Sequence, residues 1–297
     1  MRITNNMVLR NSLAGLQTNK SAVQRLQTQI TANVRIATAS DDPAGAEQLM
    51  GADSSLGAID QYKRNIQAAT SKNAIEETAF GQVTDLLARA KELLTGQATD
   101  TASASTRQIA GREMEAIFSS VVALGNSKSG DTFLFGGTAS TTPPFAATGA
   151  GATLDFTTTN PAGAQSVQVS AGMNLTPVHD GTEAFLTSGV LASLRDAAKA
   201  LATNDVAGSR SALTALDQSF QQVQTLAGEN GAKRNTLDTT AQNLDSLKIT
   251  LSTFRSNLQD IDIEAAVTTL VTKQTAYQAA MAVTSKVLNL SLTDYLR

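Results

Sequence analysis

The 297-residue sequence contains a single histidine, and this side chain is the one best suited to act as a general base. His179 precedes Asp180 and Gly181 in a segment rich in Pro and Gly. A general base has to lie within hydrogen-bond reach of its substrate, usually with a second group that orients it. Nothing in the spacing predicts such a set, so we interpret His179 as a surface loop residue. The chain has no Cys, which excludes thiolate nucleophiles and disulfides. We expect no catalytic residue.

Carboxylates and glycines at two other places could bind a cation or a phosphate. Asp41, Asp42 and Glu47 lie close together, but they lack the central Gly and terminal Glu of a calcium loop. The glycines at positions 136, 137, 149 and 151 are not followed by the Lys of a phosphate-binding loop. We therefore predict no metal ion and no cofactor. The first motif suits a helix start instead, with Asp42 as N-cap and Pro43 in the first turn.

Both ends of the chain carry apolar residues at heptad spacing, and such a stripe has to be buried against another helix. The N-terminal stripe consists of Leu9, Leu13, Leu16, Val23, Ile30 and Val34. The C-terminal stripe consists of Ile263, Val267, Leu270, Tyr277, Met281 and Leu288. We predict that the two terminal helices pair as an antiparallel coiled coil. Termini used in this way indicate assembly rather than catalysis, and these twelve side chains are the predicted assembly interface.

Further apolar residues flank the two stripes and make each wider than one partner helix can bury. They are Val8, Leu26, Ile36, Val271, Val287 and Leu292. We expect these side chains to be exposed in a monomer and covered by neighbouring subunits. We also expect the terminal segments to become well ordered only when they stack on those neighbours.

The remaining pattern predicts a mostly α fold with a small β-rich inserted domain. Helical periodicity covers residues 5–33, 43–94, 106–124, 188–202, 205–254 and 258–292. Between Thr132 and Thr182 there is no Lys or Arg, four of the five prolines occur, and short alternating runs predict strands. The predicted domains are a terminal coiled coil (1–40 and 256–297), a helical rod (41–131 and 183–255) and a small outer β-rich domain (132–182).

Charge and hydropathy exclude several partners. The net charge of −3 does not provide the basic field that nucleic-acid binding needs. No apolar run is long enough for a membrane span or a secretory signal, so we expect no stable membrane insertion. If the protein leaves the cell, we expect it to be exported without a cleavable signal. The first 40 residues hold five basic side chains and no acidic one, which we interpret as a solvated helix face.

Three segments of the chain resemble the flagellin family. They are the start at residues 2–7 (RITNNM), the stretch at 36–45 (IATASDDPAG), and the stretch at 231–237 (GAKRNTL). The second resembles the family's joint between the terminal coiled coil and the next domain. The resemblance therefore implies that Asp41, Asp42 and Pro43 form an inter-domain joint, and that the terminal helices line the innermost layer of a tube.

Other segments resemble the members of this family at the junction between hook and filament. They are residues 130–138 (GDTFLFGGT), followed by 142–145 (TPPF), and the tail at 291–296 (SLTDYL). The resemblance implies a secreted structural adaptor of the bacterial flagellum, outside the cell, that self-assembles with identical subunits. Its implied partners are a hook-side junction protein, filament flagellin and an export chaperone at the C-terminal helix. It also implies export by the flagellar type III apparatus.

Two other functions fit parts of the same pattern. A filament flagellin would share the paired termini, and short flagellins have small outer domains; residues 134–145 and the tail discriminate against it. A secreted coiled-coil component of a virulence type III system would also lack a signal peptide. Such a protein is not expected to carry the flagellin-like segments at both ends.

Overall fold

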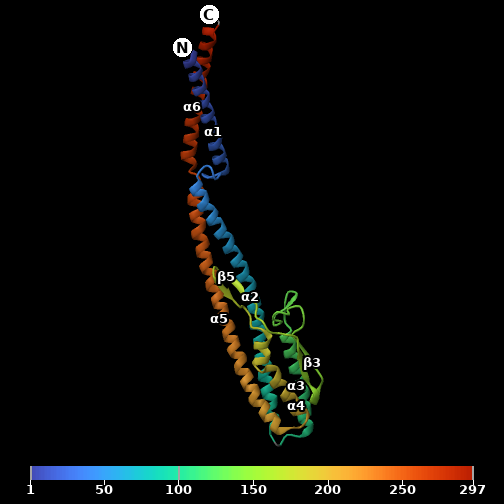
Figure 1. Ribbon diagram of the computed structural model, residues 1–297. Coiled ribbons are helices and arrows are strands. Elements are labelled where there is room, and N and C mark those ends of the chain that lie inside the picture. The colour runs from blue at the N-terminus through green and yellow to red at the C-terminus, as the bar shows by residue number, and fades with distance from the viewer. Residues whose placement is uncertain (1, 100, 296–297) are drawn as a thin grey trace. The chain divides into compact units, whose positions relative to one another are not determined.

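The computed structural model describes residues 2–99 and 101–295, with the side chains of 2–6, 8, 9 and 287–295 left out. Six long helices carry most of this chain (Figure 1). They are α1 (Arg2–Ala32), α2 (Pro43–Gln97), α3 (Ala104–Gly125), α4 (Val190–Ala202), α5 (Val206–Gln259) and α6 (Ile263–Tyr295). The prediction of a mostly α fold is confirmed. None of the described helices is apolar enough over the length needed to cross a membrane.

Short strands and turns fill the segment between α3 and α4. The strands form three antiparallel pairs, β1 (Lys128–Ser129) with β2 (Thr132–Phe133), β3 (Phe145–Thr148) with β4 (Asp155–Thr158), and β5 (Val167–Ser170) with β6 (Met173–Leu175). A 3₁₀ turn, η1 (Gly151–Thr153), precedes β4, and a π-helix, η2 (Thr182–Thr187), precedes α4. The predicted β-rich insertion is therefore present, as separate hairpins.

Side chains that accept backbone N–H groups set the starts of four helices. Oδ1 of Asp42 accepts the N–H of Gly45 at 2.9 Å at the start of α2. Oδ1 of Asp205 accepts the N–H of Gly208 at 2.9 Å, and Oδ1 of Asp262 accepts that of Ala265 at 3.1 Å. The fourth cap, on α3, is Ser103. Each cap satisfies a donor that the first helical turn leaves unpaired.

The chain forms two compact units. The first unit comprises Met1–Ala58 and Ser246–Arg297, and the second comprises Ile59–Asp245. The first unit extends further along α2 and α5 than the predicted coiled-coil domain, because the start of one helix and the end of the other pack together there. The three-part division into coiled coil, rod and outer domain stays a prediction.

The β-rich segment shares one hydrophobic core with the helices of the second unit. Phe135 meets Phe185 edge-on at a centroid distance of 5.0 Å, and Phe145 lies 5.4 Å from the same ring. All three rings are buried in the cluster that also contains Leu87 and Phe118. The β1–β2 and β3–β4 hairpins are thus anchored by aromatic packing, which contributes free energy beyond the buried area alone.

Candidate assembly interface

The terminal helices lie side by side and run in opposite directions (Figure 1). Val34, just beyond α1, forms an antiparallel bridge with Asp260, just before α6. Ala266 and Thr284 are buried on α6, and Leu270 and Tyr277 between them are partly buried. The spacings of 4 and 7 residues follow one face of the helix. The predicted antiparallel pairing is therefore confirmed.

The predicted stripes are divided between this pairing face and the solvent. Leu16, Val23, Ile30, Val34, Leu270 and Tyr277 are partly buried. Leu13, Ile263, Val267 and Met281 are exposed. The side chains of Leu9 and Leu288 lie outside the described residues. Whether the exposed members contact neighbouring subunits stays a prediction, but they present apolar surface that this chain does not cover itself.

The residues that flank the two stripes also differ in their exposure. Val271 is 55% exposed, as the sequence predicts. Leu26 is partly buried, and Ile36 is buried at 6%, so the expectation that Ile36 is exposed was wrong. Ile36 follows the end of α1 and packs under the joint rather than extending the stripe. Val8, Val287 and Leu292 lie outside the described side chains.

Asp41, Asp42 and Pro43 lie at the turn from α1 into α2, which we call the joint. The turn lies within the first compact unit, and its role between domains stays a prediction. Oδ2 of Asp41 accepts the backbone N–H groups of Ala37 at 3.2 Å and Thr38 at 2.9 Å. The hydrogen bond from the Thr38 N–H contributes most to lowering the pKa of the Asp41 carboxyl. The Gly45 N–H, followed by Arg35, lowers the pKa of Asp42 in the same way. Both aspartates thus hold the turn as carboxylates.

Arg35 ties the joint to the end of α5. Its backbone N–H donates to the Gln259 carbonyl at 2.6 Å, and its Nη2 donates to the Leu258 carbonyl at 2.9 Å. Its Nη1 lies 3.2 Å from Oδ2 of Asp42. One arginine therefore links the entry to α2 with the carbonyls that end α5, where a cation is favoured by the helix dipole. The structure gives Arg35 a role that the sequence pattern alone did not single out.

Gly45 allows the side chains of Asp42 and Ile36 to lie directly against the backbone of α2. A Cβ at this position would lie 2.6 Å from both Oδ2 of Asp42 and Cδ1 of Ile36. Real Cβ contacts are not this short, so any side chain would displace the cap or the buried isoleucine. The residue is needed for space, since its backbone is helical.

His179 lies in the second unit and is 2% exposed, so its interpretation as a surface loop residue was wrong. Oε1 of Glu76 accepts its backbone N–H at 2.8 Å and lies 3.0 Å from Nδ1. Phe80 packs against the ring at a centroid distance of 6.0 Å. The partners come from α2, more than 100 positions away, so local sequence could not reveal them.

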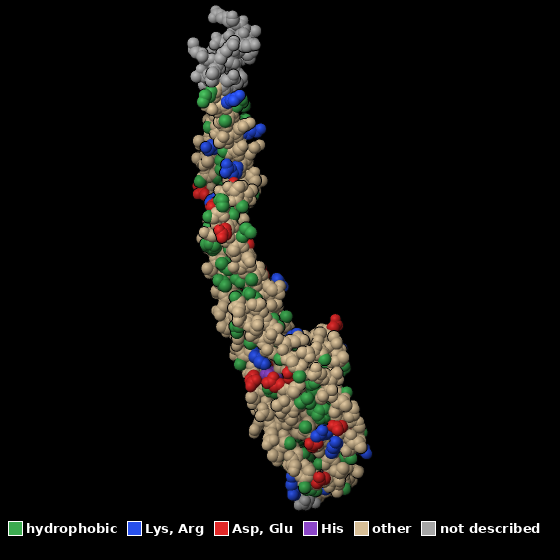
Figure 2. Space-filling model, viewed as in Figure 1, with side chains coloured by type: hydrophobic (Ala, Val, Ile, Leu, Met, Phe, Trp, Pro, Cys, Tyr) green, Lys and Arg blue, Asp and Glu red, His purple; other side chains and the backbone are tan. Residues whose placement is uncertain are grey.

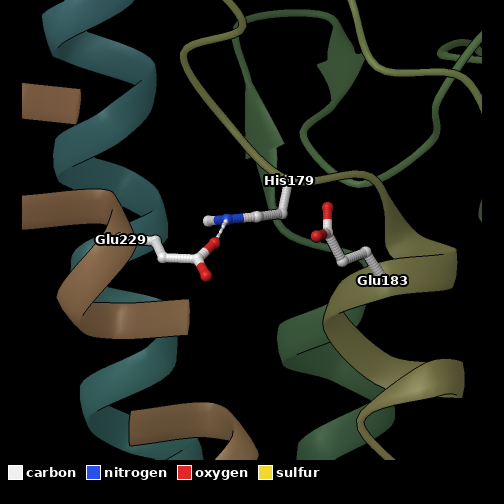
Figure 3. A group of neighbouring side chains, drawn as sticks. All are labelled: His179, Glu183 and Glu229. Carbon is white, nitrogen blue, oxygen red and sulfur yellow. Dashed lines mark hydrogen bonds and ion pairs between the residues drawn. The ribbon is translucent and has the colours of Figure 1, made fainter. Parts of the chain in front are cut away.

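Three possible metal ligands meet at this histidine. His179, Glu183 and Glu229 each offer an atom within 4.8 Å of the others (Figure 3). Nε2, however, lies 3.0 Å from the ammonium of Lys233, which donates to the lone pair that a metal would need. Lys233 therefore occupies the nitrogen that a metal ion would need, and Figure 2 shows acidic side chains gathered beside the histidine.

Two family models match this chain. The bacterial flagellin N-terminal helical region matches residues 3–139, and the bacterial flagellin C-terminal helical region matches residues 213–296. Together they span about three quarters of the sequence. The first match includes α1, the joint and α2, and the second includes most of α5 and α6. Both halves of the terminal helix pair thus fall within the family's own helical regions.

Similar proteins match almost end to end. Flagellar hook-associated protein 3 of Escherichia coli is 25% identical over 98% of both chains. The protein of that name from Salmonella typhimurium is 26% identical over 94% of this chain and 95% of its own. The flagellin of Bacillus subtilis is 25% identical over 95% of this chain and 94% of its own.

Solved structures share the fold. FlgL of Bacillus cereus has a TM-score of 0.57 and 21% identity, and the match covers 69% of this chain and 99% of that one. The flagellar junction protein FlgL of Legionella pneumophila has a TM-score of 0.54 and 14% identity, covering 71% of this chain and all of that one. The two family models match both ends of the chain, and these ends form the paired helices α1 and α6. This chain therefore belongs to the bacterial flagellin family.

Proposed function

We propose that this chain is the structural adaptor that joins the bacterial flagellar hook to the filament. The observation that carries the proposal is the near full-length match to two proteins named flagellar hook-associated protein 3. The family is structural rather than enzymatic. In this proposal the chain works outside the cell as a ring or short tube segment, between a hook-side junction protein and filament flagellin.

The exposed apolar side chains of the terminal helices supply a physical basis for assembly. Val271, Met281 and Val283 are each more than half exposed on α6, while Ala266 and Thr284 of the same helix are buried where α6 lies against α1. A tube needs open contacts in which one face of a subunit meets a different face of its neighbour. A helix pair that buries one stripe within the subunit and leaves other apolar side chains exposed offers those exposed side chains to a neighbour. An export chaperone that covers α6 before assembly would shield the same residues.

Filament flagellin is the second candidate, because flagellins match over a similar length. Residues 130–138 favour the adaptor, since this segment resembles junction members and forms a structural element here. It contains β2 and the buried Phe135, and Phe135 belongs to the hydrophobic cluster of the second unit. A virulence-secretion protein is not favoured, because both flagellin family models match.

Deletion of the gene separates these functions. Electron microscopy of the cell surface is combined with an assay for flagellin in the medium. The adaptor predicts bare hooks with flagellin monomers lost to the medium. Bare hooks without flagellin in the medium would make this chain the filament subunit, and intact filaments would refute both flagellar roles. Complementation with the wild-type gene controls for effects on neighbouring genes.

A further inference from the structure

The only imidazole of the chain lies among charged groups from several elements of the second unit. His179 belongs to the segment that leads from β6 into η2, and its ring points toward α5 (Figure 3). The charged residues that face or adjoin it are Lys72, Glu76, Asp180, Glu183, Glu229 and Lys233. Their arrangement distinguishes the two ring nitrogens, because each nitrogen has its own partners.

The partner of Nδ1 is fixed. Glu76 is completely buried, and its Oε1 lies 3.0 Å from Nδ1 while also accepting the His179 backbone N–H at 2.8 Å. A carboxylate only accepts hydrogen bonds, so Nδ1 carries a hydrogen in both protonation states of the ring. Any proton gained or lost by the ring is therefore gained or lost at Nε2.

Nε2 has two partners, and they carry opposite charges. Oε2 of Glu229 lies 3.2 Å from Nε2, and Nζ of Lys233 lies 3.0 Å from it. Lysine can only donate, so it suits the neutral ring, whose Nε2 accepts. Glutamate can only accept, so it suits the charged ring, whose Nε2–H donates. Both residues come from α5, four positions apart, which places them on the same face of the helix.

We propose that Glu229 and Lys233 exchange as the partner of Nε2, so that His179 fastens the segment between β6 and η2 to α2 and α5 in both of its protonation states. With the ring charged, Glu76 and Glu229 hold it from both sides. With the ring neutral, Glu76 and Lys233 hold it. The segment that His179 fastens directly follows the β5–β6 hairpin, so the exchange keeps the end of that hairpin attached to α2 and α5 across the neutral pH range.

The electrostatic balance at the ring supports this exchange. Burial, the largest influence, favours the neutral ring, but the hydrogen bond and charge of Glu76 outweigh it and raise the pKa of His179 above 6.5. Lys233 opposes the charged ring and Glu229 supports it. A raised pKa by itself gives stability below the unfolded value that is lost as pH rises through the folded value. The hydrogen bond from Lys233 counters that loss.

An NMR titration of the full chain tests the exchange, because one histidine gives one imidazole signal, which His179→Gln assigns by removing it. Lys233→Met removes both the repulsion of the charged ring and the donor to the neutral ring, so the midpoint should rise. Glu229→Gln should lower it. Arg234→Met and Glu77→Gln are matched controls, since these residues pair with each other on the same two helices. Their midpoints should stay near that of the wild type.

The exchange also predicts how firmly the segment is held. The protection factor of the His179 amide should stay high on both sides of the midpoint in the wild type. It should fall above the midpoint in Lys233→Met and below it in Glu229→Met, which leaves Nε2–H without that acceptor. Lys233→Arg should keep the protection because it retains a donor, and Glu229→Gln should keep it because it retains an acceptor. Midpoints that move in the same direction, or protection that does not change with pH in Lys233→Met or Glu229→Met, would overturn the proposal. Far-UV circular dichroism checks that each variant is folded.

Discussion

Asn73 of α2 and Asn230 of α5 bind each other's backbone. Nδ2 of Asn73 donates to the Asn230 carbonyl at 3.1 Å, and Nδ2 of Asn230 donates to the Asn73 carbonyl at 3.1 Å. Both residues are buried. The reciprocal pair joins two long helices. Apolar contacts have no fixed direction, whereas these hydrogen bonds to the backbone fix the register of α2 against α5.

Asn230→Ala should lower the free energy of unfolding by about 0.5–1.5 kcal/mol, because it removes the hydrogen bond from Asn230 Nδ2 to the buried Asn73 carbonyl. Asn235→Ala, at an exposed position on the same helix, is the matched control and should change it by less than about 0.5 kcal/mol. Urea denaturation followed by circular dichroism measures both. Equal stability of the two variants would mean that the reciprocal pair contributes nothing to holding α2 and α5 together.

Gly45→Ala should destabilise the first unit, although alanine normally favours a helix by about 0.5–1 kcal/mol over glycine. The new Cβ would lie 2.6 Å from Asp42 and from Ile36. Gly51→Ala is the control on the same helix, where a Cβ meets nothing within 4 Å, and it should be neutral or stabilising. Thermal melts of the two variants should therefore shift in opposite directions. A stabilised Gly45→Ala variant would show that the joint adjusts freely.

The joint should loosen in acid. The hydrogen bonds from the backbone N–H groups of Thr38 and Gly45 hold the folded pKa values of Asp41 and Asp42 below the ordinary value of 3.8. A carboxylate with a lowered pKa stabilises the fold above its unfolded pKa, and that stability is lost as pH falls through the folded value. Proteolysis near residues 37–45 by pepsin should therefore accelerate as pH falls below 3.8. Asp41→Asn should remove part of this pH dependence, whereas Glu47→Gln, an exposed change on α2, should retain it.

The helices could be predicted from sequence because their signals are local. Heptad spacing indicated α1 and α6, and Asp42 with Pro43 indicated the start of α2 to the residue. Gly228 and Gly231 have a weak helix preference, yet they lie within an unbroken α5. There, the buried contact of Asn230 with α2 outweighs the weak helix preference of the flanking glycines.

His179 and Ile36 could not be predicted because their partners are distant or depend on geometry. The partners of His179 lie on α2 and α5, 103 and 50 positions away. Ile36 continues an apolar pattern in sequence, but α1 ends at Ala32, so the heptad phase no longer describes where the residue points. Periodicity predicts a face only while the helix continues.

The exposed face of α6 provides the most direct test of assembly. Val271→Glu and Met281→Glu place a carboxylate on side chains that are 55% and 51% exposed, so the monomer should fold with unchanged stability. In a tube the same carboxylates would be buried without partners, which costs several kcal/mol per charge. Cells carrying these variants should show bare hooks and shed flagellin. Ile109→Glu makes the same chemical change on α3 at a side chain that is 68% exposed, and it should leave filaments intact. If α6 variants with wild-type stability and normal secretion still carried filaments, the outward residues of α6 would not be the assembly interface.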